Sequence, residues 1–239
     1  MLRILNFYGI REMDKMKDNF ISLASHELRS PLTAIKGYVE LLGEHNEGKL
    51  DEESQKYLRN MGISVDRLNA LINDILEISK LEGNRIPFKI SIFNPKEIIH
   101  KSVDEMKFQA KKKNLSLACL PCPDIQIRAD RKRLGQILVN LIGNAIKYTE
   151  QGKIEIKTEV KGEELLISVN DTGMGISEEN LVNLFQKFYR IKNDKTRSVS
   201  GTGLGLWIAR GLSKKMDGDI TVESTEGIGS QFTIHLPLA

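Results

Sequence analysis

A histidine followed directly by an acid lies in a helical segment that a proline interrupts. His26 stands in the run Phe20-Ile21-Ser22-Leu23-Ala24-Ser25-His26-Glu27-Leu28-Arg29-Ser30-Pro31-Leu32. Pro31 has no N–H, so it removes the helical hydrogen bond to the carbonyl of Glu27 and loosens the backbone beside a nucleophilic imidazole. Glu27 can orient that ring or accept its proton. A lone histidine in an amphipathic helix is usually structural, but this pattern indicates an imidazole that can carry chemistry.

Two asparagines and a lysine are spaced to share one side of a predicted helix. Asn140 and Asn144 lie four residues apart in Asn140-Leu141-Ile142-Gly143-Asn144-Ala145-Ile146-Lys147-Tyr148, and Lys147 follows one turn later. Amide oxygens are suitable ligands for Mg²⁺, and a lysine supplies a compact charge for phosphate. Taken alone, two asparagines on a helix face are more often solvated.

Glycine-rich runs follow this helix. Asp171-Thr172-Gly173-Met174-Gly175 comes after an apolar strand, so its carboxylate stands at a strand end where it can accept from an exocyclic amine. Gly201-Thr202-Gly203-Leu204-Gly205-Leu206 opens a helix, whose backbone N–H groups favour an anion. Between them, the aromatic run Phe185-Gln186-Lys187-Phe188-Tyr189-Arg190 suggests a lid anchor, with Arg190 available for phosphate. A last run, Gly227-Ile228-Gly229-Ser230-Gln231-Phe232, leads into the final strand. No P-loop sequence is present.

Two long amphipathic helices must position His26. Apolar residues step by three and four from Met13 to Leu42, and again from Leu58 to Ile75. The stepping changes phase between Leu23 and Leu28, which predicts that His26 points outward. Two such helices cannot bury both apolar stripes alone, so the pattern favours a four-helix bundle made by two chains. The alternative is that both helices pack on the second domain of their own chain.

The remaining residues alternate between helical and strand patterns. Helices are predicted over 95–113, over 131–148 with Asp130 as the N-cap, and over 204–216. Strands are predicted over 91–93, 115–120, 125–129, 153–160, 165–170, 219–224 and 231–236, and the segment 173–203 holds one short helix. This order predicts a two-layer α/β sandwich of largely antiparallel strands. The domains expected are 1–83 for the helical hairpin, 84–90 for a hinge and 91–239 for the sandwich.

Composition limits the class of protein. The 239 residues carry a net charge of +3, which is too small to demand a nucleic-acid partner. No apolar run approaches the length of a membrane span. We therefore expect a soluble, cytoplasmic chain without membrane contact, which could be the inner portion of a longer receptor. Cys119 and Cys122 form a CxxC without a second metal-ligand pair, and reduced loop cysteines are expected in preference to a redox or zinc site.

The order and spacing of these runs resemble those of sensor histidine kinases, from about Arg11 to the C-terminus. The run around His26 resembles their phosphoacceptor box, and the later runs resemble the asparagine, glycine and phenylalanine boxes of the GHKL (Bergerat) ATP-binding fold. The resemblance implies that Asp171 holds the adenine amine and that Asn144, with Asn140, serves Mg²⁺. It also implies that the ATP is contacted by Lys147, Tyr148, Gly173, Gly175, Arg190, Gly201, Thr202, Gly203, Leu204, Gly205 and Leu206.

The reaction implied by this resemblance is ATP-dependent phosphorylation of His26, followed by transfer to an aspartate of a response regulator. Glu27 would act as the acid/base, the active form would be a homodimer, and Ser30 occupies the family's phosphatase position. GHKL ATPases such as gyrase carry a glutamate where this chain has Asn140, and an amide cannot act as the hydrolytic base. The alternatives are a nucleotide-binding scaffold without chemistry and a GHKL ATPase machine, which Asn140 disfavours.

Overall fold

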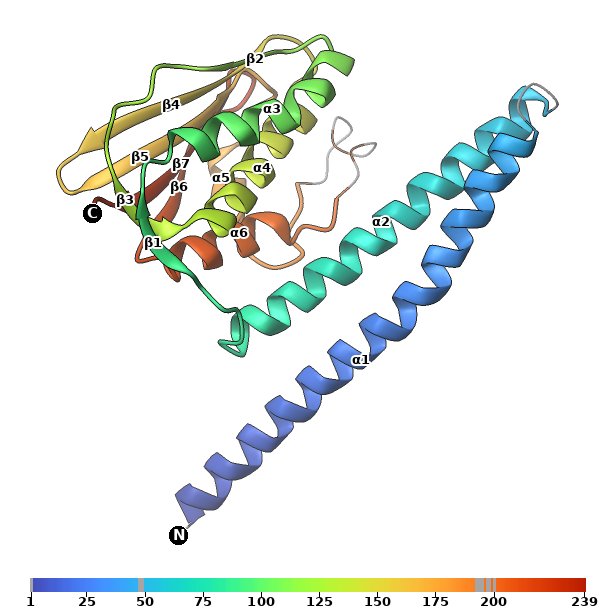
Figure 1. The fold of residues 1–239 in the computed structure, drawn as a ribbon, viewed down its shortest axis with the longest axis horizontal. Coiled ribbons are helices and arrows are strands. Elements are labelled where there is room, and N and C mark those ends of the chain that lie inside the picture. Colours follow the sequence, from blue (N-terminus) through green and yellow to red (C-terminus); the bar gives the residue numbers. More distant parts are fainter. Residues whose placement is uncertain (1, 47–49, 192–195, 197–198, 200) are drawn as a thin grey trace. The chain divides into compact units, whose positions relative to one another are not determined.

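The chain forms two compact units in a computed structural model that describes residues 2–46, 50–191, 196, 199 and 201–239. Side chains are described from residue 21 onward, except those of Ser22 and His26. The first unit comprises Met1–Ile86 with Ser200–Thr202, and the second comprises Pro87–Val199 with Gly203–Ala239. Figure 1 shows a helical hairpin and a mixed helix and sheet unit. The hinge predicted at 84–90 stays a prediction.

The first unit is an antiparallel hairpin of α1 (Leu2–His45) and α2 (Glu52–Glu82). Both predicted helices are confirmed, although α1 begins at Leu2, well before the apolar stepping starts. Asp51 caps α2, because its carboxylate accepts from the backbone N–H of Ser54 at 2.8 Å. Pro31 lies inside α1, which continues past it, and the Thr33 hydroxyl donates to the carbonyl of Arg29 at 2.9 Å.

One heptad seam closes the hairpin. Leu32 on α1 packs with Val65 and Ile72 on α2, and all three are buried. Polar pairs flank this small core: the Lys36 ammonium lies 2.8 Å from the Asp66 carboxylate. Arg29 donates to the side chain of Asn73 at 3.1 Å. These contacts fix the register of the two helices.

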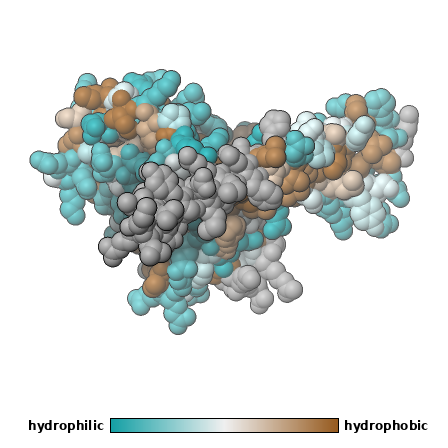
Figure 2. Space-filling model, turned by 90° about the horizontal axis from the view of Figure 1, so that it is seen from below, coloured by the Kyte–Doolittle hydropathy of each residue, from teal (hydrophilic) through white to brown (hydrophobic). Residues whose placement is uncertain are grey.

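A second heptad seam of the hairpin faces solvent. Leu28, Ile35 and Leu42 recur every seven residues on α1, and Met61 and Leu68 do so on α2. All five side chains are between 41% and 50% exposed. Brown apolar patches lie among teal and white along the arm on the right of Figure 2, which holds the loop end of the hairpin. A single chain therefore leaves a continuous apolar stripe uncovered.

The second unit is the predicted two-layer α/β sandwich. A five-stranded sheet has the order β2-β4-β5-β7-β6, and a separate ribbon pairs β1 with β3. Figure 1 shows the helices layered against the sheet. The elements are β1 (Ile90–Phe93), α3 (Lys96–Lys112), β2 (Ser116–Cys119), β3 (Ile127–Asp130), α4 (Arg131–Tyr148), β4 (Lys153–Lys161), β5 (Glu164–Asp171), α5 (Glu178–Leu181), α6 (Gly205–Lys214), β6 (Asp219–Thr225) and β7 (Gly229–Pro237).

The strand pairing is antiparallel except at one edge of the sheet. β4 and β5 form the predicted hairpin, in which Ile156 lies opposite Val169 and Gly162 takes a φ of +62° in the turn. β2 pairs with β4 in parallel, so it reaches its place through a crossover rather than a tight turn. Asp171, the last residue of β5, lies opposite Ser230 of β7.

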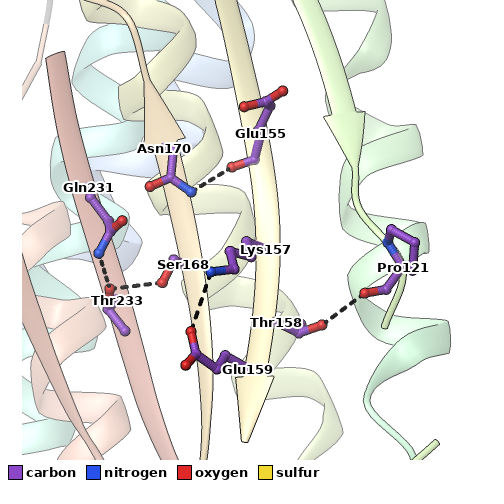
Figure 3. A network of polar contacts seen from close by, with 9 residues as sticks. All are labelled: Pro121, Glu155, Lys157, Thr158, Glu159, Ser168, Asn170, Gln231 and Thr233. Carbon is purple, nitrogen blue, oxygen red and sulfur yellow. Dashed lines mark hydrogen bonds and ion pairs between the residues drawn. The ribbon is translucent and has the colours of Figure 1, made fainter. Parts of the chain in front are cut away.

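The two faces of the sheet differ in chemistry. Ile154 and Ile156 of β4, with Ile167 of β5, have no exposed surface and belong to the core that the helices cover. The alternate residues form a polar face, which Figure 3 shows across β4, β5 and β7. Its centre is a hydrogen bond of 2.9 Å between the hydroxyls of Ser168 and Thr233. The helices thus cover only the apolar face, as the alternation of the strands predicts.

Candidate functional site

Helix α4 is anchored at both ends, which fixes the asparagines along it. At the start, the Asp130 carboxylate accepts from the backbone N–H groups of Lys132 at 2.9 Å and Arg133 at 3.1 Å, so the predicted N-cap is confirmed. At the other end, the Lys113 ammonium donates to the carbonyls of Ile146, Lys147 and Thr149, at 2.8, 3.0 and 3.3 Å. A cation at a helix C-terminus also complements the helix dipole.

The asparagine run and the second glycine run meet at one point. The Asn144 side-chain amide donates to the Oδ1 of Asn140 at 3.3 Å, which confirms that both side chains share a face of α4. Gly205, the first residue of α6, lies so close to Asn140 that a Cβ added there would overlap its amide nitrogen. The start of α6 therefore approaches the asparagine pair, as a site for a phosphate chain and a hard cation requires.

Asp171 and the loop after β5 form a second part of the site. The Asp171 carboxylate accepts from the backbone N–H of Gly173 at 2.8 Å. Its partial burial raises the pKa, and backbone donors at Gly173 and Ser230 oppose that shift. A Cβ on Gly173 would lie 2.5 Å from the carbonyl of Tyr148 and 2.9 Å from the hydroxyl of Thr149. Asp171 is thus held beside the end of α4.

The last glycine run closes around the same loop. A Cβ on Gly229 would overlap the carbonyl of Asp171, and one on Gly175 would overlap the carbonyl of Thr225. Gly175 has a φ of +64° and Gly229 a φ of +147°, which favour glycine. These residues are glycines because two backbone segments pass closely here.

The aromatic run lies against the second glycine run. A Cβ on Gly203 would lie 2.8 Å from the carbonyl carbon of Phe188, and Gly203 has a φ of +75°. The Tyr189 hydroxyl donates to the side chain of Asn180 at 2.6 Å. Arg190 donates to the carbonyl of Val199 at 2.5 Å, so the end of the aromatic run is hydrogen-bonded to a residue just before the second glycine run.

Lys147 and Tyr148 lie at the end of α4. The Lys147 ammonium is 5.0 Å from the centre of the Tyr148 ring, a cation–π contact. Burial raises the pKa of the Tyr148 hydroxyl, while the charge of Arg190 opposes this shift. Tyr148 is therefore a half-buried ring at the end of α4, within reach of the charge of Arg190.

Not every predicted residue joins this cluster. Gly201 and Thr202 group with the hairpin unit, whereas Gly203 to Leu206 belong to the sandwich. The Leu204 side chain is fully buried, so it is a core residue and only its backbone can face a ligand. Glu27 and Ser30 are exposed on α1. The His26 side chain lies outside the described part of the structure, and so does the prediction that it points outward.

Two supporting residues were not predicted. Lys113 ends a run of three lysines, which is typical of a solvated helix end, and its partners lie 33 to 36 residues away. Thr149 is fully buried, and its hydroxyl has no hydrogen-bond partner among the described residues. The unpaired hydroxyl stands beside Asp171 and Gly173. A partly buried carboxylate, amide oxygens and close-approach glycines together fit a nucleotide with its metal.

Known proteins share both units. Residues 16–84 match the model of the His Kinase A (phospho-acceptor) domain. Residues 129–239 match the model of the histidine kinase-, DNA gyrase B-, and HSP90-like ATPase. A phosphoacceptor hairpin followed by a GHKL ATP-binding sandwich defines the class of the protein.

Individual relatives carry the same assignment. The chain is 36% identical to the sensor histidine kinase RcsC of Escherichia coli strain K12 over 229 residues, which are 95% of this chain and 24% of RcsC. It is similar to full-length ShkA, crystallised with AMPPNP, with a TM-score of 0.72, 30% identity and coverage of 92% of this chain and 46% of ShkA. It is also similar to the catalytic domain of the histidine kinase ThkA, with a TM-score of 0.55 and 32% identity. This match covers 63% of this chain and 97% of the ThkA domain.

The chain therefore belongs to the sensor histidine kinase family. It spans between 24% and 43% of the length of the curated relatives compared with it, and 24% of RcsC. Within the described residues, no helix is both long enough and apolar enough to cross a membrane.

Proposed function

We propose that this chain phosphorylates its own His26 with ATP and passes the phosphoryl group to an aspartate of a response regulator, inside the cytoplasm. The observation that carries the proposal is the meeting of the nucleotide motifs in one unit. Gly205 touches Asn140, and Gly173 lies between Asp171 and Tyr148. The residue that would activate water in the related ATPases is an amide here, so the bound ATP would be kept for transfer.

The described residues divide the binding of ATP between them. Asp171 would accept from the adenine amine, and the backbone at the start of α6 would donate to the phosphates. Asn144 and Asn140 would hold Mg²⁺ through their amide oxygens, and Lys147 would add positive charge. The metal would neutralise part of the phosphate charge. The partly buried position of Asp171 strengthens a hydrogen bond to a neutral base.

The chemistry would take place on the hairpin. A neutral imidazole nitrogen of His26 would form a bond to the terminal phosphorus, while the bond to the bridging oxygen breaks and ADP leaves. Glu27 would take the proton from the other ring nitrogen. Exposed Glu27 and Ser30 flank His26 on α1. The phosphatase role of Ser30 stays a prediction.

The partner of the hairpin would be a second copy of the chain. The exposed heptad seam of Leu28, Ile35 and Leu42 has the spacing of a coiled-coil core. Pairing two hairpins through it would build a four-helix bundle. The response regulator is proposed from the membership of the chain in the sensor histidine kinase family.

Incubation with γ-labelled ATP tests the proposal. Wild-type protein should gain acid-labile label, and His26→Gln should gain none while still binding ATP. His45→Gln is the matched control: His45 ends the same helix, bonded to the carbonyl of Leu41 at 3.0 Å, and its loss should leave labelling unchanged. Undiminished label in the His26→Gln protein would contradict the proposal, and ATP binding without label in the wild type would favour the scaffold.

A further inference from the structure

Arg210 on α6 is held in one orientation by Asp219 at the start of β6. Its Nε donates to Oδ1 at 2.7 Å and its Nη2 donates to Oδ2 at 2.9 Å. This two-pronged pair is the geometry in which a guanidinium binds a carboxylate best. Arg210 lowers the pKa of Asp219 by hydrogen bonding, so the pair is ionised at neutral pH.

The free face of this guanidinium is used by the aromatic run. The Cζ of Arg210 lies 4.7 Å from the centre of the Phe185 ring, within the range of a cation–π contact. Because Asp219 binds the edge of the Arg210 guanidinium, the flat face of the guanidinium is available to the Phe185 ring. Phe185 is the first residue of the run that ends at Arg190.

In a second cation–π contact, the aromatic run supplies the cation and α6 supplies the ring. The ammonium of Lys187, in the aromatic run, lies 4.6 Å from the centre of the Trp207 ring on α6. Trp207 and Arg210 are three residues apart, so they stand on neighbouring positions of one helix face. The run is therefore fastened to α6 at two points, one turn apart.

We propose that Arg210 and Asp219 are positioning residues for the nucleotide, because they clamp residues 185–190 onto the helix whose first residue touches Asn140. The inference rests on the proposed ATP site. Clamping the run to α6 sets Phe188 against Gly203 and places Arg190 relative to the phosphate-binding end of α6. The Arg210 and Asp219 side chains are 35% and 38% exposed, so the pair contributes little to global stability. Its loss should thus affect nucleotide binding more than folding.

The test compares four variants of the whole chain by ATP affinity, by labelling and by the fluorescence of Trp207, the single tryptophan. Arg210→Leu removes both the ion pair and the stacking, and should weaken ATP binding about tenfold. Arg210→Lys keeps a positive charge but cannot form the two-pronged pair, and Asp219→Asn removes the carboxylate that orients the guanidinium. Each should weaken ATP binding by roughly threefold. ATP should change the Trp207 emission of wild-type protein, and Arg210→Leu should lose most of that change.

Asp217→Asn is the matched control. It breaks the exposed pair of Asp217 with Arg128, 3.2 Å apart, two residues before Asp219, and should alter neither ATP affinity nor fluorescence. Wild-type affinity and an unchanged Trp207 response in all Arg210 and Asp219 variants would overturn the clamp while leaving the kinase intact. If Arg210→Leu unfolds, the two milder variants decide. A wild-type chain that binds no ATP would instead overturn the proposed function, and the clamp with it.

Discussion

In the sandwich, the apolar side chains between the sheet and the helices are buried. In the hairpin, apolar side chains that recur every seven positions along α1 are half-exposed. Leu138 and Ile154 of the sandwich have no exposed surface, but Leu28 and Leu42 of the hairpin are each 50% exposed. The sandwich therefore completes its core within one chain. The hairpin has one buried seam, around Leu32, Val65 and Ile72, and one exposed seam that the proposed dimer would cover.

The same contrast separates the two parts of the proposed reaction. The nucleotide motifs lie where buried backbone and glycine contacts fix their geometry. The phosphoacceptor run lies on a helix whose surroundings are largely exposed. Exposed helix surface around the phosphoacceptor run suits the proposed reaction, in which His26 would meet first the ATP site and then a response regulator.

The largest effect is expected from a charge in the open seam. Leu42→Asp would place a carboxylate in the apolar stripe, and burying an unpaired charge there is strongly unfavourable. We expect the proposed dimer of the wild-type chain to be absent in this variant at micromolar concentration, as measured by analytical ultracentrifugation. Glu44→Asp, on the same helix outside the stripe, is the control. A Leu42→Asp protein that stays dimeric would show that the two chains do not pair through their exposed heptad seams.

A cavity in the closed core should cost stability without changing the oligomeric state. Leu138→Ala removes a fully buried side chain from α4 and should lower the free energy of unfolding by about 2–5 kcal/mol. Urea denaturation followed by circular dichroism measures this change. A loss well below about 2 kcal/mol would mean that the core around Leu138 is not closely packed.

Asp171→Asn should weaken ATP binding without lowering the stability of the folded chain at pH 7. Losing a charged acceptor should weaken ATP binding roughly ten- to a hundredfold. Because burial raises the pKa of Asp171, the folded state binds more protons than the unfolded one above pH about 3.9, so stability falls as pH rises through that window. Asparagine cannot ionise, so the ATP-free variant should be at least as stable as wild type at pH 7. Urea titrations of both proteins at pH 4 and pH 7 check the sign, and an Asp171→Asn variant that is less stable than wild type at pH 7 would contradict it.

The smallest effect is expected from a single added methyl group. Gly205→Ala would push on the amide of Asn140, and should weaken ATP binding about tenfold or less. Gly135→Ala on α4 is the control, because its Cβ would lie at an ordinary 3.6 Å from Ile98. It should stabilise the protein by roughly 0.5–1 kcal/mol without changing ATP affinity. Equal ATP affinity in both variants would argue against contact between the two motifs.

Local signals allowed much of the fold to be predicted. Asp130 as the N-cap of α4, the β4–β5 turn at Gly162 and the short helix after the first glycine run follow from neighbouring residues alone. The family resemblance of the boxes supplied the site residues and their proposed roles. Their convergence could not be derived from spacing, because Asn140 and Gly205 are 65 residues apart and only the fold brings them together.

Other features depend on tertiary contacts that leave no local trace. Lys113 resembles any lysine at a helix end, and Arg210 resembles any exposed arginine on an amphipathic helix. The family resemblance implies that Leu204 contacts ATP, which stays a prediction; its side chain is buried in the core, a placement that the flanking glycines do not predict. The parallel pairing of β2 was likewise not predicted, since β2 and β4 are separated by a strand and a helix.

We propose above all that the phosphoryl group of ATP bound by the sandwich is transferred to one histidine of the hairpin. The most direct measurement is to digest the protein after incubation with ATP and to map the phosphorylated peptide at neutral pH by mass spectrometry. The account predicts a single phosphoryl group, lost in acid and retained in base, on the peptide that contains His26. A phosphoryl group on another residue, or ADP formed without any protein phosphorylation, would contradict it.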